Sequence, residues 1–388
     1  MKIAIDIRKI GKRSTGDEVV FYHLVKELAK LAESKKHSFF LLTDQGVAKI
    51  GRILGKLPSN FEIHKVSPTA KLFWTFYSLP RFLRKNPVDV LHVEYIVPFH
   101  LSRKTKIITT IHDVSFRVNP QWIPRKDGLL LNNFIPLSLK RADGVITVSN
   151  FSKREIAKYY GYPSDRIYVT YPAVDERVFG INTNQVSKKE VNKVIGGDYP
   201  FIFHLSSLQP RKNVPLIISG FAKVKAQWLQ ANYPWANTKL VIVGNNKGHN
   251  YDNLINETIA RLGLSKDVIM TGFLPTEILP SFYRESLVFV FPSDYEGFGI
   301  PILEAMACKT PVIASNIGSL KEVGGEAALY IDLKKSEGKV VNDLASAMQA
   351  LIENKELRKG KIMLGLERVK LFNWANLAKK TLEIYENL

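Results

Sequence analysis

The chain alternates between short apolar runs and longer stretches in which apolar residues recur at steps of three and four. In the first half, the apolar runs fall at residues 2–7, 39–42, 61–66, 89–93, 106–112, 141–148 and 168–172. Bounded runs of this length are typical of strands buried in a parallel sheet, whereas the longer spacing predicts helices. The helical spacing is clear at residues 19–31, where Val20, Leu24 and Leu28 recur.

The second half repeats this rhythm. Its apolar runs fall at residues 201–205, 240–244, 268–271, 287–291 and 311–314, and a polar stretch separates them from the first set. Alternating strands and helices predict parallel sheets covered by helices. We therefore expect α/β architecture with a first domain at 1–174, a linker at 175–199, a second domain at 200–371 and a terminal segment at 372–388.

Composition agrees with two globular domains. The chain has 388 residues, of which 45% are hydrophobic, enough for two separate cores. The single cysteine, Cys308, excludes an intramolecular disulfide and lies in an apolar helical string, where we expect a small buried hydrophobe rather than a nucleophile. No signal-peptide core and no membrane-spanning run is present, so we expect a cytoplasmic protein.

The positive charge is concentrated in the first half. Residues 1–180 carry 30 Lys and Arg against 16 Asp and Glu, a net +14, and the whole chain carries +19. Nucleic acid, acidic phospholipid and a phosphorylated acceptor are all compatible partners, and a solvated basic surface without a partner is the alternative.

Residues 71–85, KLFWTFYSLPRFLRK, interleave aromatic and basic side chains. This composition is typical of a helix that lies at a membrane interface, and predicts peripheral contact with the inner membrane face. A core helix with a basic end is the alternative interpretation. Pro80 is expected to interrupt the segment.

The stretch YEGFGIPILE at 295–304 lies between two apolar runs and predicts strand, loop, helix and strand. Pro301 suits a first helical position, and the glycines before it allow backbone to pass close to a ligand. A loop that opens a helix directs free N–H groups at one point, which suits a phosphate. On spacing alone, Glu304 complements the helix dipole and Glu296 is a solvated loop charge.

This string resembles the E-x7-E signature of the retaining glycosyltransferases of family 4, which have the GT-B fold. The resemblance continues through AMACKTPVIAS, GGEAALYID and, in the first half, VSNFSKREI. It implies two Rossmann-like parallel-sheet domains facing across a cleft, with the acceptor side in the first domain and the nucleotide sugar in the second. It also implies that 372–388 cross back to the first domain.

The resemblance assigns roles on the donor side. Glu296 would act in catalysis by binding hydroxyls of the donor sugar, and Glu304 would hold the ribose hydroxyls. The remaining residues implied to bind the nucleotide sugar are Gly297, Phe298, Gly299, Ile300 and, near the base, Leu274. Lys309 stands where the family usually has a glycine ending the helix; a left-handed non-glycine residue there would cost about 1 kcal/mol.

Arg211 and Lys212 follow the apolar run 201–205 and precede a helix. Arg offers a planar fork to two oxygens and Lys a compact charge, which together suit a diphosphate; a solvated pair is the alternative. The string LQPRKN resembles the family's phosphate clamp, so both residues are expected to act in catalysis. Ser206 replaces a usual glycine and is expected to narrow the donor pocket.

His112 and Asp113 end an apolar run, and ligands of open α/β sheets bind beyond the carboxyl ends of strands. A structural histidine is the alternative. The string TIHDV resembles the family's HD site, which implies that His112 contacts the donor sugar and that Asp113 orients it or contacts the acceptor. The loop KIGKRSTGDEV resembles the family's first glycine loop only loosely through Gly16, with Gly11 as a second candidate. A plain strand-to-helix turn is equally compatible.

Cofactors are not expected. The sequence has no G-x-G-x-x-G after an early strand, as a dinucleotide enzyme would need, and no Asp-x-Asp for a metal. Fixed cations and helix N-terminal amides would instead offset the charge of a leaving diphosphate. Nucleic acid is not expected as a partner, because no recognisable nucleic-acid motif is present.

These observations predict a retaining, metal-independent glycosyltransferase. The resemblance favours transfer of mannose from GDP-mannose to a glycan or lipid-linked acceptor in cell-surface polysaccharide or glycolipid synthesis. A UDP-glucose or UDP-N-acetylglucosamine transferase of the same fold is the first alternative. A sugar-nucleotide epimerase of similar fold and a non-catalytic basic binding protein are alternatives from other classes.

Overall fold

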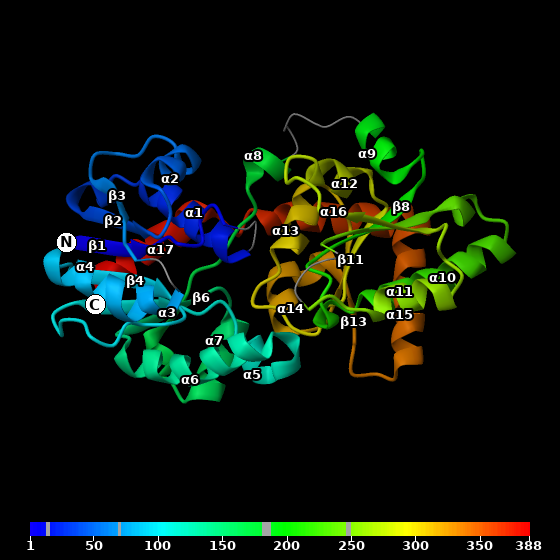
Figure 1. Cartoon of the computed structure of the whole chain (residues 1–388). Coiled ribbons are helices and arrows are strands. Elements are labelled where there is room, and N and C mark those ends of the chain that lie inside the picture. Colours follow the sequence, from blue (N-terminus) through cyan, green and yellow to red (C-terminus); the bar gives the residue numbers. More distant parts are fainter. Residues whose placement is uncertain (13–15, 69–70, 181–187, 246–249) are drawn as a thin grey trace. The chain divides into compact units, whose positions relative to one another are not determined.

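The computed structural model of the chain describes residues 1–12, 16–68, 71–180, 188–245 and 250–388 (Figure 1). The chain divides into two compact units. Unit 1 comprises Met1–Pro172 and Asn373–Leu388, and unit 2 comprises Ala173–Phe372. Each unit is built around its own parallel sheet, as the pattern of apolar runs predicts.

The sheet of unit 1 has the strand order β3-β2-β1-β4-β5-β6-β7. Its strands are β1 (Lys2–Asp6), β2 (Ser38–Thr43), β3 (Phe61–Lys65), β4 (Val90–Glu94), β5 (Lys106–Thr110), β6 (Gly144–Thr147) and β7 (Ile167–Val169). The inner strands are almost entirely buried because helices cover both faces of a sheet of this kind. Glu94 at the end of β4 pairs in register with Thr110 at the end of β5, so side chains that follow these two strands lie close together.

The helices of unit 1 lie between consecutive strands, with one exception. They are α1 (Gly16–Leu28), α2 (Val47–Leu54), α3 (Lys71–Phe73), α4 (Leu79–Lys85), α5 (Ser115–Val118), α6 (Arg125–Arg141), α7 (Asn150–Tyr160) and α17 (Trp374–Glu386). The exception is α17, which follows all of unit 2 in sequence but packs against α1 in unit 1 (Figure 1).

The sheet of unit 2 has the order β10-β9-β8-β11-β12-β13. Its strands are β8 (Phe201–Leu205), β9 (Lys239–Val243), β10 (Val268–Gly272), β11 (Val288–Phe291), β12 (Val312–Ser315) and β13 (Ala328–Ile331). Its helices are α8 (Glu176–Phe179), α9 (Lys188–Ile195), α10 (Val214–Gln230), α11 (Leu254–Arg261), α12 (Leu279–Glu285), α13 (Ile300–Ala307), α14 (Gly318–Gly324), α15 (Glu337–Glu353) and α16 (Lys355–Val369). The order changes direction at β8 and β11, which is where ligands bind in doubly wound sheets.

Two segments differ from the sequence-based expectation. Residues expected as a linker contain α8 and α9, which fall within unit 2. Pro80 does not interrupt the segment 71–85, because α3, a π-helical turn (Trp74–Ser78) and α4 follow one another directly. Pro80 lies in the first turn of α4, where a missing N–H costs little.

Three smaller expectations concern Lys309, Cys308 and the membrane. Lys309 is left-handed, with φ 61°, as expected for the residue that ends the helix. Cys308 is buried, and burial raises the pKa of its thiol to about 12, which fits a small hydrophobe rather than a nucleophile. Within the described ranges, every helix is too short or too polar to span a bilayer.

Candidate functional site

The first candidate cluster lies at the carboxyl ends of β8 and β11 in unit 2. β8 and β11 are neighbours in the sheet, so the segments that follow them meet at one edge. A short 3-10 helix, Pro210–Lys212, follows β8 and carries Arg211 and Lys212, and the loop after β11 carries Glu296. The structure therefore brings together three residues that the sequence assigns to catalysis.

Glu296 accepts hydrogen bonds from both cations. Arg211 Nη1 lies 3.2 Å from Glu296 Oε2 and 2.8 Å from the carbonyl oxygen of Tyr295. The Lys212 ammonium donates to the other carboxylate oxygen, Oε1. Asn213, left-handed with φ 53°, anchors the same segment by donating to the carbonyl of Pro292 at 2.9 Å.

The electrostatics of this cluster keep Glu296 ionised. Burial raises the pKa of Glu296, but the charges of Lys212 and Arg211 outweigh it and lower the pKa to about 2. Side chains of both cations are more than four-fifths buried, so solvent screens the cluster only weakly. The arrangement is a fixed pair of positive charges that shares one carboxylate.

The loop that carries Glu296 continues through Gly299 into α13. Gly299 has φ 111° and precedes the first residue of α13, Ile300. The backbone angle requires glycine, and a Cβ there would also lie 2.6 Å from Leu320 Cδ2 and displace the end of that side chain. Phe298 packs its ring edge-on against Phe372 at 5.5 Å, which leaves only its backbone for a ligand.

Glu304 lies on α13 and has a different environment from Glu296. The hydroxyl of Tyr283 on α12 donates to Glu304 Oε2 at 2.8 Å. Burial raises the pKa of Glu304 to about 7, and the Tyr283 hydrogen bond opposes this rise only in part. Glu304 therefore titrates near neutral pH while Glu296 does not.

The Ser206 hydroxyl is held by a hydrogen bond to the buried ring of His204. His204 Nδ1 lies 2.8 Å from the carbonyl of Val290, which can only accept, so Nδ1 carries the proton. Nε2 then accepts from the Ser206 hydroxyl at 2.8 Å. Burial lowers the pKa of His204 to about 4, which keeps the ring neutral and this arrangement fixed.

Leu274, the residue expected near the base, is 9% exposed and follows Gly272, whose φ is 74°. Its neighbour Phe273 is 68% exposed. Leu274 is therefore a buried residue, and its contact with the base stays a prediction.

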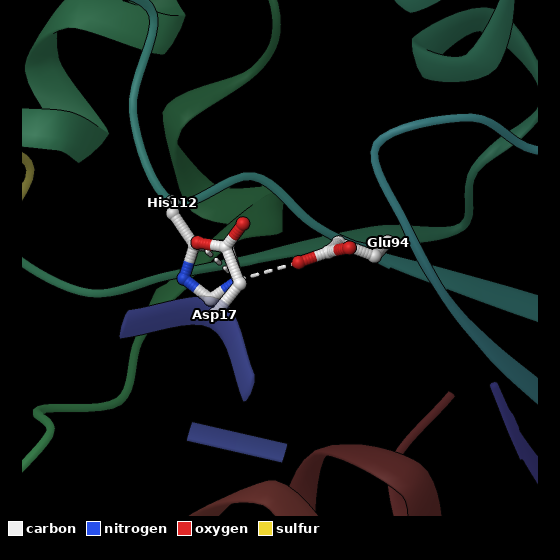
Figure 2. A group of neighbouring side chains, drawn as sticks. All are labelled: Asp17, Glu94 and His112. Carbon is white, nitrogen blue, oxygen red and sulfur yellow. Dashed lines mark hydrogen bonds and ion pairs between the residues drawn. The ribbon is translucent and has the colours of Figure 1, made fainter. Parts of the chain in front are cut away.

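The second candidate cluster lies in unit 1, at the ends of β4 and β5. Figure 2 shows the imidazole of His112 beside the carboxylates of Glu94 and Asp17. His112 Nε2 lies 3.1 Å from Glu94 Oε1 and 3.8 Å from Asp17 Oδ1. Lys9, from the loop after β1, places its ammonium 3.5 Å from Asp17 Oδ2 and 3.4 Å from Glu94 Oε2.

The charges around His112 favour its protonated form. Burial lowers the pKa of His112, but Asp17, then the hydrogen bond and charge of Glu94, raise it above the ordinary 6.5. Burial lowers the pKa of Lys9 as well, and the same two carboxylates raise it. Among the described residues, Asp17, Glu94 and His112 also form a group with the spacing of metal ligands, but the Lys9 ammonium already pairs with both carboxylates and offsets one of their two negative charges.

The other candidate residues of unit 1 are Asp113, Gly16 and Gly11. Asp113 Oδ1 accepts from the Ser115 backbone N–H at 2.9 Å, which fixes its carboxylate at the start of α5. Gly16 is the first residue of α1, and a Cβ there would meet nothing within 4 Å. Gly11 has φ 76° and donates its N–H to Glu18 at 2.6 Å, so Gly11, unlike Gly16, requires glycine for its turn.

Sequence analysis missed Glu94, Asp17, Lys9 and Tyr283. Glu94 could have been found, because it ends the apolar run next to the one that ends at His112. His92, two residues before Glu94, is structural: its ring lies 2.5 Å from the hydroxyl of Tyr385 and 2.7 Å from that of Thr110, and burial lowers its pKa to about 3.

Comparisons with known proteins cover both units. A family model described as Glycosyltransferase Family 4 matches residues 15–178, and one described as Glycosyl transferases group 1 matches 186–361. The chain is 26% identical to O-antigen chain mannosyltransferase B of Escherichia coli over the full length of both. It is 28% identical to O-antigen chain mannosyltransferase RfbU of Salmonella typhimurium, over 84% of this chain and 86% of that protein.

The fold also resembles solved structures. Sucrose-phosphate synthase of Thermosynechococcus elongatus superimposes with a TM-score of 0.75 at 20% identity, over 100% of this chain and 98% of that one. The two parallel-sheet units and this likeness confirm the predicted GT-B fold class. Within that fold class, the chain belongs to the family-4 glycosyltransferases: its first half matches the Family 4 model and its second half matches the group 1 model.

Proposed function

We propose that this chain is a retaining, metal-independent transferase that moves mannose from GDP-mannose to a glycan or lipid-linked acceptor in cell-surface polysaccharide or glycolipid assembly. The observation that carries the proposal is the buried cluster of Arg211, Lys212 and Glu296 at the switch point of the second sheet. The choice of mannose rests on the O-antigen mannosyltransferases to which the chain is similar.

The cluster suits the departure of a nucleoside diphosphate. When the bond between the anomeric carbon and the diphosphate oxygen breaks, negative charge grows on that oxygen. Arg211 and Lys212 are fixed cations that neutralise it, and the amides after Gly299 add partial positive charge. The acceptor oxygen bonds to the anomeric carbon on the same face, and its proton passes to the leaving phosphate.

Glu296 and Glu304 have separate roles in donor binding. Glu296 accepts from both cations, so a bound diphosphate would compete for them while the ionised carboxylate accepts from hydroxyls of the sugar. Glu304 would accept hydrogen bonds from the ribose diol, for which a carboxylate has two oxygens. With cations in place of a metal, binding of the nucleotide requires no divalent ion.

Calorimetric titration of GDP, UDP and ADP in EDTA tests the donor site. We expect GDP to bind most tightly, and Arg211→Ala to weaken binding about 10- to 100-fold through loss of charge-assisted hydrogen bonds. Lys355→Ala, an exposed cation in the same unit, is the matched control and should bind as wild type. Preference for UDP would redirect the donor to a UDP-sugar, and the absence of binding by all three nucleotides would refute the site.

We further infer that the acceptor lies at an anionic lipid surface that unit 1 contacts through residues 72–85. Leu72, Phe73 and Tyr77 on one side of this segment are 42%, 47% and 43% exposed. Arg81, Arg84 and Lys85 follow them and are also exposed. Apolar side chains beside cations suit the headgroup region of acidic phospholipid.

The buried side of this segment is firmly held. Trp74 is fully buried, and the Arg8 guanidinium stacks on its ring at 3.6 Å while forming an ion pair with Asp6. The exposed side is thus presented on a rigid support.

Sedimentation with vesicles of acidic phospholipid tests the lipid contact. We expect binding at low salt, weaker binding at high salt, and loss of binding in the double variant Phe73→Ser, Tyr77→Ser. Leu229→Ser, which removes a side chain 58% exposed in unit 2, is the control. Equal binding by the double variant and the control would contradict the assignment of this surface.

A further inference from the structure

Glu94 is a buried carboxylate that none of the expected donor or acceptor contacts uses. It ends β4, and its neighbouring strand β5 leads directly to His112. Tyr95, which follows it, is left-handed with φ 58°, an unfavourable angle for a bulky residue. The chain thus adopts a costly backbone conformation next to the carboxylate that faces His112.

The hydrogen bond between Glu94 and His112 determines which atom of the imidazole faces a substrate. An ionised carboxylate can only accept, so the proton of this bond is carried by His112 Nε2. Within the described part of the chain, Nδ1 of His112 makes no hydrogen bond. The ring is therefore oriented by Nε2 and leaves Nδ1 for an oxygen of a bound sugar.

We propose that Glu94 is a positioning residue for sugar transfer: its carboxylate holds Nε2–H of His112, with Asp17 beside it, so that a doubly protonated imidazole donates from Nδ1 to a hydroxyl oxygen of the transferred sugar. The role at the sugar rests on the proposed function, whereas the pairing of Glu94 with His112 does not. The raised pKa of His112 agrees with this arrangement.

Lys9 weakens the effect of the two carboxylates on His112. Its ammonium contacts both carboxylates from the side opposite His112 Nε2, with one oxygen of each carboxylate turned to the lysine and the other to the histidine. Lys9 therefore lowers the negative charge that His112 experiences. Removing Glu94 and removing Lys9 should shift the protonation of His112 in opposite directions.

Within the described ranges, further charged and titratable groups near the ring affect its protonation. The carboxylates of Asp17, Glu94 and Asp113 stabilise the imidazolium, and Lys9 opposes it. Burial raises the pKa of the Tyr95 hydroxyl well above 10, and burial keeps His92 neutral, so neither changes charge near neutral pH. The groups concerned are Lys9, Asp17, His92, Glu94, Tyr95 and Asp113.

The test is a titration of His112 by NMR on histidine-labelled full-length protein, with the His112 signal identified by its loss in His112→Asn. We expect Glu94→Gln, which keeps the shape but removes the charge, to lower the pKa of His112. Lys9→Met should raise it, an effect of opposite sign that damage to the fold would not produce. Glu62→Gln is the matched control, because Glu62 pairs with His64 at 3.1 Å in the same unit.

The second readout is GDP release from GDP-mannose in water, followed against pH. Because the protonated ring is the active form, the rate of wild type should fall as pH rises through the pKa of His112. In Glu94→Gln the fall should begin at lower pH. At pH values above the lowered pKa of His112, kcat of the variant should be about 10- to 100-fold below that of wild type, the effect of one charge-assisted hydrogen bond. In Lys9→Met the fall should begin at higher pH.

An unchanged His112 titration in Glu94→Gln would overturn the proposal, and so would a shifted titration with an unchanged pH profile of GDP release. Failure of wild type to release GDP from GDP-mannose would instead refute the proposed donor. The NMR titration needs no turnover, so it still decides whether Glu94 controls His112.

Discussion

Two glutamates eight positions apart on one loop and helix have opposite ionisation behaviour. Glu296 lies between two cations, which lower its pKa to about 2, whereas burial raises the pKa of Glu304 to about 7. The difference comes from Arg211 and Lys212, which another element places beside Glu296; the Tyr283 hydroxyl beside Glu304 only partly opposes the effect of burial. Residue type and spacing alone would not separate them.

This difference predicts how nucleotide binding depends on pH. Glu304 is protonated below about pH 7 and ionised above it, so its ability to accept from both ribose hydroxyls is lost as pH falls. We expect GDP to bind about 5- to 10-fold more weakly at pH 6 than at pH 8, the difference between hydrogen bonds to charged and neutral acceptors. Glu296 stays ionised throughout this range.

Calorimetric titration of GDP at pH 6, 7 and 8 measures this effect, and Glu304→Gln is the control. The variant cannot titrate at this position but retains the pH dependence that GDP itself contributes. The same slope in both proteins would show that Glu304 does not hold the ribose. For folding the sign is reversed: the folded state keeps the proton of Glu304 up to about pH 7, whereas a glutamate ordinarily loses it near 4.5, so the stability of the protein falls as pH rises from about 4.5 to about 7.

The sequence identified most candidate residues that lie in one continuous string, such as Glu296 with Gly299 and Arg211 with Lys212. It missed residues whose importance depends on a neighbour from another strand or helix. Glu94 matters because β4 and β5 are paired in register, and Tyr283 because α12 packs against α13. A single sequence shows neither contact.

At the scale of elements, buried parallel strands were the most predictable part of the fold. Apolar runs located β1 and β8 through β12 to within about two residues, since strands covered on both faces need apolar side chains throughout. β13 was not singled out, because its run, ALYI, is short; two of its four residues are only partly buried.

Helices were harder to predict where a segment contains residues that are unfavourable in a helix or is mostly polar. Pro80 was expected to interrupt the segment 71–85, but the π-helical turn before it shifts Pro80 to the start of α4. The polar stretch 175–199 was expected to be a linker. It nevertheless contains α9, where Val191 and Ile195 are buried at spacing four on an otherwise polar helix.

At the scale of the molecule, the two domains followed from the rhythm of apolar runs, but the position of α17 did not. Only the resemblance to family-4 enzymes implied that the last segment returns to the first domain, and the structure places α17 in unit 1. Its contacts explain the placement: Trp374 stacks on His23 at 4.3 Å, and Tyr385 bonds to His92. Asn373 caps the helix by accepting from the N–H of Ala375 at 2.7 Å.

This placement predicts that a change in the last helix destabilises unit 1 and leaves nucleotide binding in unit 2 intact. Leu382 is 3% exposed, so Leu382→Ala should lower the free energy of unfolding by about 2–4 kcal/mol through lost apolar contact and a cavity. Lys380→Ala, on the exposed side of the same helix, should change it by less than about 0.5 kcal/mol. Urea unfolding measures both changes in stability. Calorimetric titration of GDP should give the same affinity for both variants. The reason is that the donor cluster of Arg211, Lys212 and Glu296 belongs to the other unit. Equal stability of the two variants would show that α17 contributes little to unit 1, whereas weaker GDP binding by Leu382→Ala alone would show that the helix also supports the donor site.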